Sequence, residues 1–203
     1  MAIRLTIFTL TISTFFSCQA IIKYHMGFKD PDIEKEKDVL AVTEKNGINQ
    51  SYFLKKEKIY DAYIGSFPKI YIFNKTGHQV IHYNCFEMIK ESLNGLVDTI
   101  PEKLSPQPFR DKFVRETIQT KEENLLPVGN YDYEVFFYWS VWLGKFNIKK
   151  LQLAQKTIEE INQSSNQKVV LIPVNFDFIE ESGWTEASVE TEMKRLTDAQ
   201  KKK

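Results

Sequence analysis

The chain is poor in cysteine, which limits the redox chemistry open to it. Its 203 residues contain only two, Cys18 and Cys85. A dithiol cycle within one molecule would therefore need both of them as free thiols. Aromatic residues are abundant by contrast, with 15 Phe, 9 Tyr and 3 Trp in a hydrophobic fraction of 42%, enough for a substantial core. The length predicts one domain plus an appendage, or at most two small lobes.

The sequence also lacks net charge. Its 27 Lys and Arg residues balance 27 Asp and Glu residues, and no basic run is interleaved with aromatic residues. Nothing in this pattern predicts a nucleic-acid partner. We interpret the final lysines, residues 201–203, as a solvated tail.

Motifs for common cofactors and metals are missing as well. The sequence contains no phosphate-binding loop, no nucleophile elbow and no Cys/His cluster with zinc spacing. His78 and His82 share a face of a predicted strand, but four residues of strand span ~13 Å, too far for one ion without further ligands. Asp177, Glu180 and Glu181 follow another predicted strand, and we interpret them as solvated loop charges. We expect no cofactor and no metal.

The N-terminus has the pattern of a secretory signal. Arg4 supplies a positive charge, and an apolar run follows from Leu5 to Phe16. A bilayer needs ~20 apolar residues, so this run is too short to span one. We predict that residues 1–17 are a signal peptide.

The end of this run, Phe15-Phe16-Ser17-Cys18, resembles the lipobox of bacterial lipoproteins, although Phe15 and Phe16 depart from its usual residues. The resemblance implies a lipidated Cys18, a tether over residues 18–29 and a periplasm-facing anchor in the cell envelope. The mature chain would then keep only Cys85 and could form no intramolecular disulfide. The alternative is an ordinary signal peptide with a coincidental cysteine.

Periodicity and turn residues predict alternating helices and strands. The first predicted helix starts at Asp30, its N-cap, and ends at Gly47; the second runs from Cys85, capped by Asn84, to Asn94. The third runs from Phe109 to Glu122. The fourth includes Ile148, and the last follows Thr185, its N-cap. The predicted strands are 52–54, a hairpin of 70–73 and 79–83 around a turn at 74–77, 133–139, and 169–176, where Pro173 indicates an edge or an irregularity.

These elements predict an α/β fold with a mixed sheet flanked by helices. The order strand, helix, strand over residues 133–177 is a parallel βαβ unit. We divide the domain 30–203 into a hairpin half, 52–95, a linker, 96–130, and a βαβ half, 131–203. The hairpin could instead belong to a separate small subdomain.

The segment from Phe137 to Phe146 resembles the thioredoxin-like family, in which a strand ends in Phe-Trp-Ala-x-Trp before Cys-Gly-Pro-Cys at a helix start. Trp139, Ser140, Trp142 and Gly144 match this pattern. Leu143 and Phe146 stand at the two cysteine positions, and Lys145 stands at the proline position. The strand ending in Val174-Asn175-Phe176-Asp177 is similar to the family's next strand.

Residues before this segment also resemble parts of the thioredoxin-like family. The Ser66-Phe67-Pro68 stretch and the hairpin after it resemble the family's cis-proline loop and closing hairpin, which in ordinary members follow the cysteine motif. The resemblance therefore implies a permuted order of elements or a combination of two half-lobes. An unrelated α/β fold with accidental likeness is the alternative.

With both motif cysteines replaced, the usual dithiol cycle is excluded. The resemblance then implies either a structural module of the cell envelope or a binding module whose groove receives an extended peptide or envelope protein. Its expected lining comes from the match and from the proline loop: Trp139, Trp142, Leu143, Gly144, Lys145, Phe146, Phe67 and Pro68. The competing function is a single-cysteine thiol oxidoreductase or peroxidase-like enzyme using Cys85. If that thiol is inert, Cys85 is a small buried hydrophobe.

Overall fold

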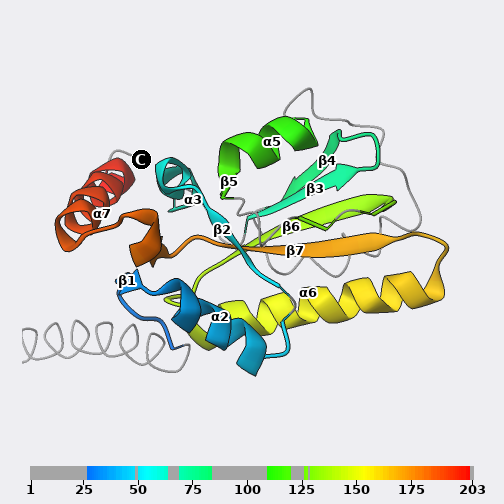
Figure 1. Ribbon diagram of the computed structural model, residues 1–203, viewed down its shortest axis with the longest axis horizontal. Helices are drawn as coiled ribbons and strands as arrows, with labels where there is room; N and C mark the ends of the chain where they lie inside the picture. The colour runs from blue at the N-terminus through cyan, green and yellow to red at the C-terminus, as the bar shows by residue number, and fades with distance from the viewer. Residues whose placement is uncertain are drawn as a thin grey trace, which may run out of the picture.

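A computed structural model describes residues 27–48, 50–63, 69–83, 109–119, 126–127 and 129–201 of the chain (Figure 1). The helices are α2 (Glu36–Lys45), α3 (Ile59–Tyr63), α5 (Arg110–Thr117), α6 (Gly144–Ser164) and α7 (Glu186–Lys201), with short 3-10 turns at Lys56–Lys58 and Glu180–Ser182. The strands are β1 (Ile33–Glu34), β2 (Tyr52–Leu54), β3 (Ile70–Asn74), β4 (Gln79–Tyr83), β5 (Ile118–Gln119), β6 (Tyr133–Trp139), β7 (Val169–Asn175) and β8 (Phe178–Ile179).

Six strands form one mixed sheet in the order β4-β3-β6-β7-β2-β5. The central strands β6, β7 and β2 run parallel, whereas the hairpin β3–β4 and the short β5 are antiparallel to their neighbours. Because β3 pairs with β6 over five residue pairs, the hairpin is part of the main sheet and not a separate subdomain. The predicted α/β fold with a mixed, helix-flanked sheet is confirmed.

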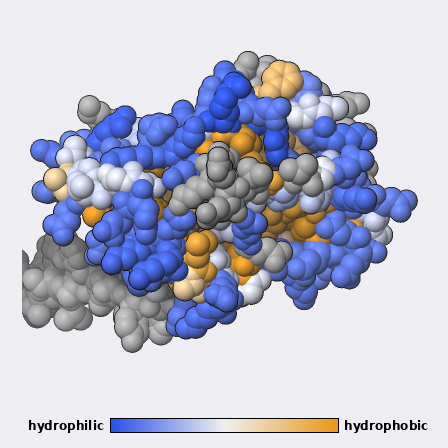
Figure 2. Space-filling view, viewed as in Figure 1, coloured by the Kyte–Doolittle hydropathy of each residue, from blue (hydrophilic) through white to orange (hydrophobic). Residues whose placement is uncertain are grey.

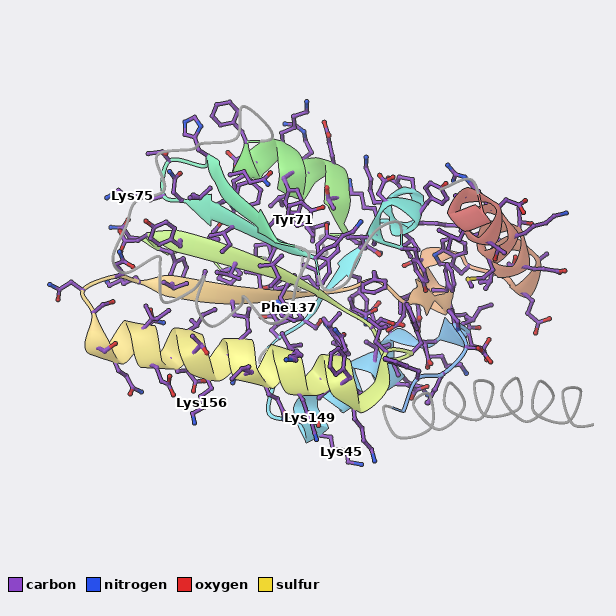
Figure 3. All side chains as sticks on the ribbon, turned by 180° about the vertical axis from the view of Figure 1, so that it is seen from behind. Lys45, Tyr71, Lys75, Phe137, Lys149 and Lys156 are labelled. Carbon is purple, nitrogen blue, oxygen red and sulfur yellow. The ribbon has the colours of Figure 1, made fainter. Side chains whose placement is uncertain are left out.

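Helices cover both faces of this sheet (Figure 1). On one face, α6 and α2 bury a cluster that includes Leu151, Ile158 and Val39 against alternate strand residues such as Phe137. On the other face, α3, α5 and α7 pack against Phe136, Tyr138 and their neighbours. Tyr71 and Phe137 accordingly lie on opposite faces (Figure 3). Burial on both faces explains why β6 is almost continuously apolar.

The hairpin turn is built as the sequence predicts. The side-chain oxygen of Asn74 accepts hydrogen bonds from the backbone N–H groups of Thr76, at 3.1 Å, and His78, at 2.9 Å. Gly77 takes a φ of 79°, which favours glycine. Local polar bonds and a glycine thus reverse the chain within four residues.

Two helix boundaries differ from the prediction. The first helix begins at Glu36 and not near Asp30, because Ile33–Glu34 forms a strand that pairs in parallel with Phe178–Ile179. The helix α5 ends at Thr117 and not at Glu122, because Ile118 and Gln119 pair with β2. In both cases tertiary strand pairing overrides local helix propensity.

Pro173 lies in an interior strand, so the expectation of an edge is wrong. Pro173 pairs with Phe137 of β6, while β2 pairs with β7 only from Val174 onward. The Pro173 carbonyl accepts a hydrogen bond from the Ser51 hydroxyl at 3.4 Å, on the side where β2 begins. The missing proline N–H therefore falls where the β2 ladder has not yet started.

Several predicted features lie outside the described residues. They are Cys18 and the signal peptide, the Phe67-Pro68 stretch, and the helix from Cys85 to Asn94. Their predictions remain as stated. Within the described ranges, no helix has the length and apolarity needed to cross a membrane.

Candidate functional site at the start of helix α6

The turn between β6 and α6 is the place where the sequence predicts a site. Strand β6 ends at Trp139, and its carbonyl accepts a hydrogen bond from the N–H of Phe176 at 3.1 Å. The helix begins at Gly144, whose φ is 61° and whose N–H bonds the Val141 carbonyl at 3.0 Å. A left-handed first residue requires glycine here, because a Cβ would strain this backbone.

A buried carboxylate holds this turn. Asp177 is only 3% exposed and lies just beyond the end of β7. It accepts hydrogen bonds from the Ser140 hydroxyl, from the Val141 N–H at 2.9 Å and from the Asn175 side-chain amide at 2.6 Å. The ends of β6 and β7 are therefore joined through one side chain, and the turn has a single well-defined shape.

The protonation of Asp177 is set by opposing effects. Burial raises the pKa of its carboxyl group above the ordinary value, and the hydrogen bonds that it accepts limit this rise. Glu34 on the neighbouring β1 also has a raised pKa, first because of burial and then because of the charge of Asp177. The charge of Asp177 thus raises the pKa of a carboxyl group on an adjoining segment.

Asn147 supports the turn from within α6. It is fully buried, and its side-chain oxygen accepts a hydrogen bond from the Ser140 N–H at 2.9 Å. The Ser140 hydroxyl in turn accepts a bond from the Trp142 N–H at 3.3 Å. Since Ser140 is also fully buried and its hydroxyl donates to Asp177, it orders the backbone and does not present a nucleophile.

Trp139 lies in the core beneath the turn. Its indole N–H donates a 2.9 Å hydrogen bond to the hydroxyl of Ser51, and both residues have no exposed surface. The tryptophan that the sequence places in the groove therefore supports the turn from below and does not itself line a surface.

Trp142 belongs to an aromatic cluster above Asp177. It stacks on Tyr63 with ring centroids 5.4 Å apart, and Phe178 stacks on Tyr63 with the same separation. Phe176 meets both Tyr63 and Trp142 edge to face. Burial and the nearby Asp177 charge raise the pKa of the Tyr63 hydroxyl far above its ordinary value, so this group stays protonated at neutral pH.

The chain's own N-terminal segment crosses the start of α6. The Lys29 N–H donates a 2.8 Å hydrogen bond to the Trp142 carbonyl. Phe28 meets Phe146 edge to face at 6.4 Å, and a Cβ added at Gly27 would lie 3.6 Å from the backbone nitrogen of Lys145. Residues 27–34, here called the N-terminal strap, continue from this contact into β1.

The remaining predicted lining residues differ in exposure. Leu143 is 8% exposed and packs in the core on the α7 side of the sheet, which fits its apolar character. Phe146 is half-buried under the strap, and Lys145 is exposed. Phe67, Pro68 and Cys85 lie outside the described residues, so the structure does not place them against this turn.

Sequence reasoning missed the central group of the site. Asp177 is buried and hydrogen-bonded, so its interpretation as a solvated loop charge is wrong, while Glu180 and Glu181 are exposed as predicted. The available signal was Asn175 two residues before Asp177, an arrangement in which the Asn175 side-chain oxygen accepts the Asp177 N–H at 3.0 Å. Ser51 and Tyr63 carried no local signal because their partners, Trp139 and Trp142, are distant in sequence.

Comparisons add no relative to this picture. No protein-family model, no curated protein and no solved structure matches the chain. Over the described ranges, no group of three or more His, Cys, Asp or Glu side chains is placed to hold a metal ion. The geometry of the turn is therefore the basis for the functional argument.

Proposed function

We propose that this chain is a lipid-anchored, thioredoxin-like module of the cell envelope that binds an extended polypeptide at the start of α6, without dithiol chemistry. Support for the family comes from the sheet. The parallel pair β6–β7 is linked by α6, and the hairpin β3–β4 pairs with β6 although it precedes β6 in sequence. That neighbourhood is the one implied by a thioredoxin-like sheet with permuted order.

The observation that carries the binding proposal is the hydrogen bond from the Lys29 N–H to the Trp142 carbonyl. It means that the turn before α6 can pair with the backbone of an extended segment, here the chain's own N-terminal strap. Main-chain bonds of this kind give affinity without a fixed sequence, while neighbouring side chains give selectivity. Here Trp142 and Phe146 are half-buried aromatic side chains beside that contact.

The same turn offers no thiol. Leu143 and Phe146 occupy the two positions where a dithiol pair would stand, and Leu143 is packed in the core. The polar groups beneath them fix the backbone of the turn through Asp177 and Asn147. A rigid turn without a reactive group suits recognition, because less freedom is lost on binding.

Site-specific photo-crosslinking in the native envelope tests this proposal. A benzophenone side chain replaces Phe146 in one variant and Phe109, which is 52% exposed, in the matched control. We expect discrete cross-linked products from position 146 and none of the same size from position 109. Equal labelling at both positions, or no product at position 146, would contradict a docking site at the start of α6.

A further inference from the structure

The outer face of α6 carries a stripe of lysines, of which only Lys145 belongs to the expected lining of the proposed docking site. The first thirteen residues of the helix, 144–156, contain four lysines and no Asp or Glu. Lys145, Lys149 and Lys156 are exposed, and they fall within about 40° around the helix axis at 3.6 residues per turn. We call these three residues the α6 lysine stripe.

The stripe lies on the side of the molecule away from the sheet. Figure 3 shows Lys149 and Lys156 pointing outward from α6, with Lys45 of α2 on the same side and Lys75 at the turn of the hairpin β3–β4. From the opposite side, Figure 2 shows a surface of mainly hydrophilic residues with hydrophobic patches near its centre. Leu153 is an apolar residue, 37% exposed, that lies between Lys149 and Lys156 along the helix. Only at the far end does an acid join the row, where Glu160 lies 3.8 Å from Lys156.

Local stability does not account for these lysines. The N-terminus of a helix carries partial positive charge, so acidic residues are favoured in its first turn and lysines are not. The first turn of α6 contains no acidic residue and includes Lys145. A positive charge at this position is more readily explained by an anionic partner than by the helix itself.

The N-terminal strap sets the distance at which a lipid on Cys18 would hold this stripe from a membrane. Gly27 and Lys29 contact Lys145 and Trp142, so the chain leaves the domain at the start of α6. The nine residue steps from Cys18 to Gly27 span at most about 30 Å when fully extended. A lipid on Cys18 would therefore hold the start of α6 within about 30 Å of the bilayer.

We infer that the α6 lysine stripe is a docking surface for anionic lipid headgroups. This inference rests on the proposed lipid anchor at Cys18, which confines the domain to the membrane surface. Lysines at such a surface are attracted to anionic lipids, and the attraction weakens within a Debye length and with added salt. With Leu153 among them, the lysines orient α6 along the bilayer and leave the opposite layer, α5 and α7, toward the aqueous side.

Vesicle binding tests the inference independently of the anchor. The probe is the mature chain from residue 18 with Cys18→Ser, mixed with vesicles of pure phosphatidylcholine or with about a third phosphatidylglycerol. We expect sedimentation with the anionic vesicles only, reversed by salt. The triple variant K145E/K149E/K156E should bind at least about 10-fold more weakly. The matched control K75E/K112E/K194E changes three exposed lysines outside α6, in the hairpin turn, α5 and α7, and should bind within about 3-fold of the parent.

Equal losses in the two triple variants, or equal binding to both vesicles, would overturn the inference. So would binding of the stripe to acidic poly-glutamate in preference to anionic vesicles. Circular dichroism of both variants confirms folding. Mass analysis of Cys18 from the native host tests the anchor separately: an unmodified Cys18 would refute the proposed lipidation without altering the vesicle result.

Discussion

The Ser140 hydroxyl donates a hydrogen bond to the buried carboxylate of Asp177, and this contact ties the end of β6 to the residue that follows β7. The two residues are 37 positions apart in sequence. Around them, the N–H of Val141 and the amide of Asn175 bond the same carboxylate. The turn that precedes α6 is therefore shaped by a polar group beneath it.

Replacing this carboxylate by its amide should destabilise the protein. In Asp177→Asn, an NH2 group faces donors that now bond the carboxylate, so buried donors lose their acceptor. We expect the free energy of unfolding to fall by about 2 kcal/mol, measured by urea denaturation. The control Asp198→Asn, at an exposed position of α7, should change it by less than about 0.5 kcal/mol. Equal effects of the two substitutions would argue against a stabilising role for Asp177.

The difference in stability between wild type and Asp177→Asn should depend on pH. Burial raises the pKa of Asp177 in the folded protein above the ordinary 3.8, so protonation favours the folded state. The stability that the wild type derives from this titration is fully present below pH 3.8 and is lost as pH rises through the folded-state pKa. Urea denaturation between pH 3.5 and 7 should therefore show the advantage of wild type over Asp177→Asn shrinking with pH. A growing advantage would mean that the folded-state pKa is lowered.

Gly144 should resist substitution because of its backbone conformation. Its φ of 61° lies in the left-handed region, where a residue with a Cβ costs about 1–2 kcal/mol. We expect Gly144→Ala to lower the free energy of unfolding by that amount, even though alanine favours helices. The control Lys145→Ala, one residue further along, should be nearly neutral. A stabilising Gly144→Ala would show that the helix start tolerates an ordinary φ.

The hydrogen bond between Trp139 and Ser51 should contribute measurably to stability. Ser51→Ala leaves the buried indole N–H without its acceptor, which costs about 1–2 kcal/mol. In a Trp139→Phe background that N–H is absent, so the same serine substitution should cost less. A double-mutant cycle in urea is expected to give a coupling energy of about 1 kcal/mol. A coupling near zero would mean that the bond adds no net stability.

Much of the fold was predictable because its signals are local. The continuous apolar runs of β6 and β7, the helical spacing of α6 and the Asn74–Gly77 turn each depend on neighbouring residues. The start of α2 and the end of α5 were not predictable in this way. Both are decided by pairing with strands far away in sequence, at Phe178–Ile179 and at β2.

The candidate site likewise has features that one sequence segment reveals and features that depend on distant contacts. The sequence located the turn before α6, since this turn is a property of one segment. It did not reveal Asp177 as the group beneath the turn, nor the N-terminal strap above it, because each contact joins segments that only the folded chain brings together. Burial of a carboxylate depends on its three-dimensional surroundings and cannot be predicted from the residue type alone.

An insulin-reduction assay tests most directly the central claim that this module binds without thiol–disulfide chemistry. The mature chain and its Cys85→Ser variant are compared with a protein-free blank in the presence of dithiothreitol. We expect both proteins to reduce insulin no faster than the blank. Turnover by the parent chain that disappears in Cys85→Ser would contradict binding without thiol chemistry and favour a single-cysteine oxidoreductase.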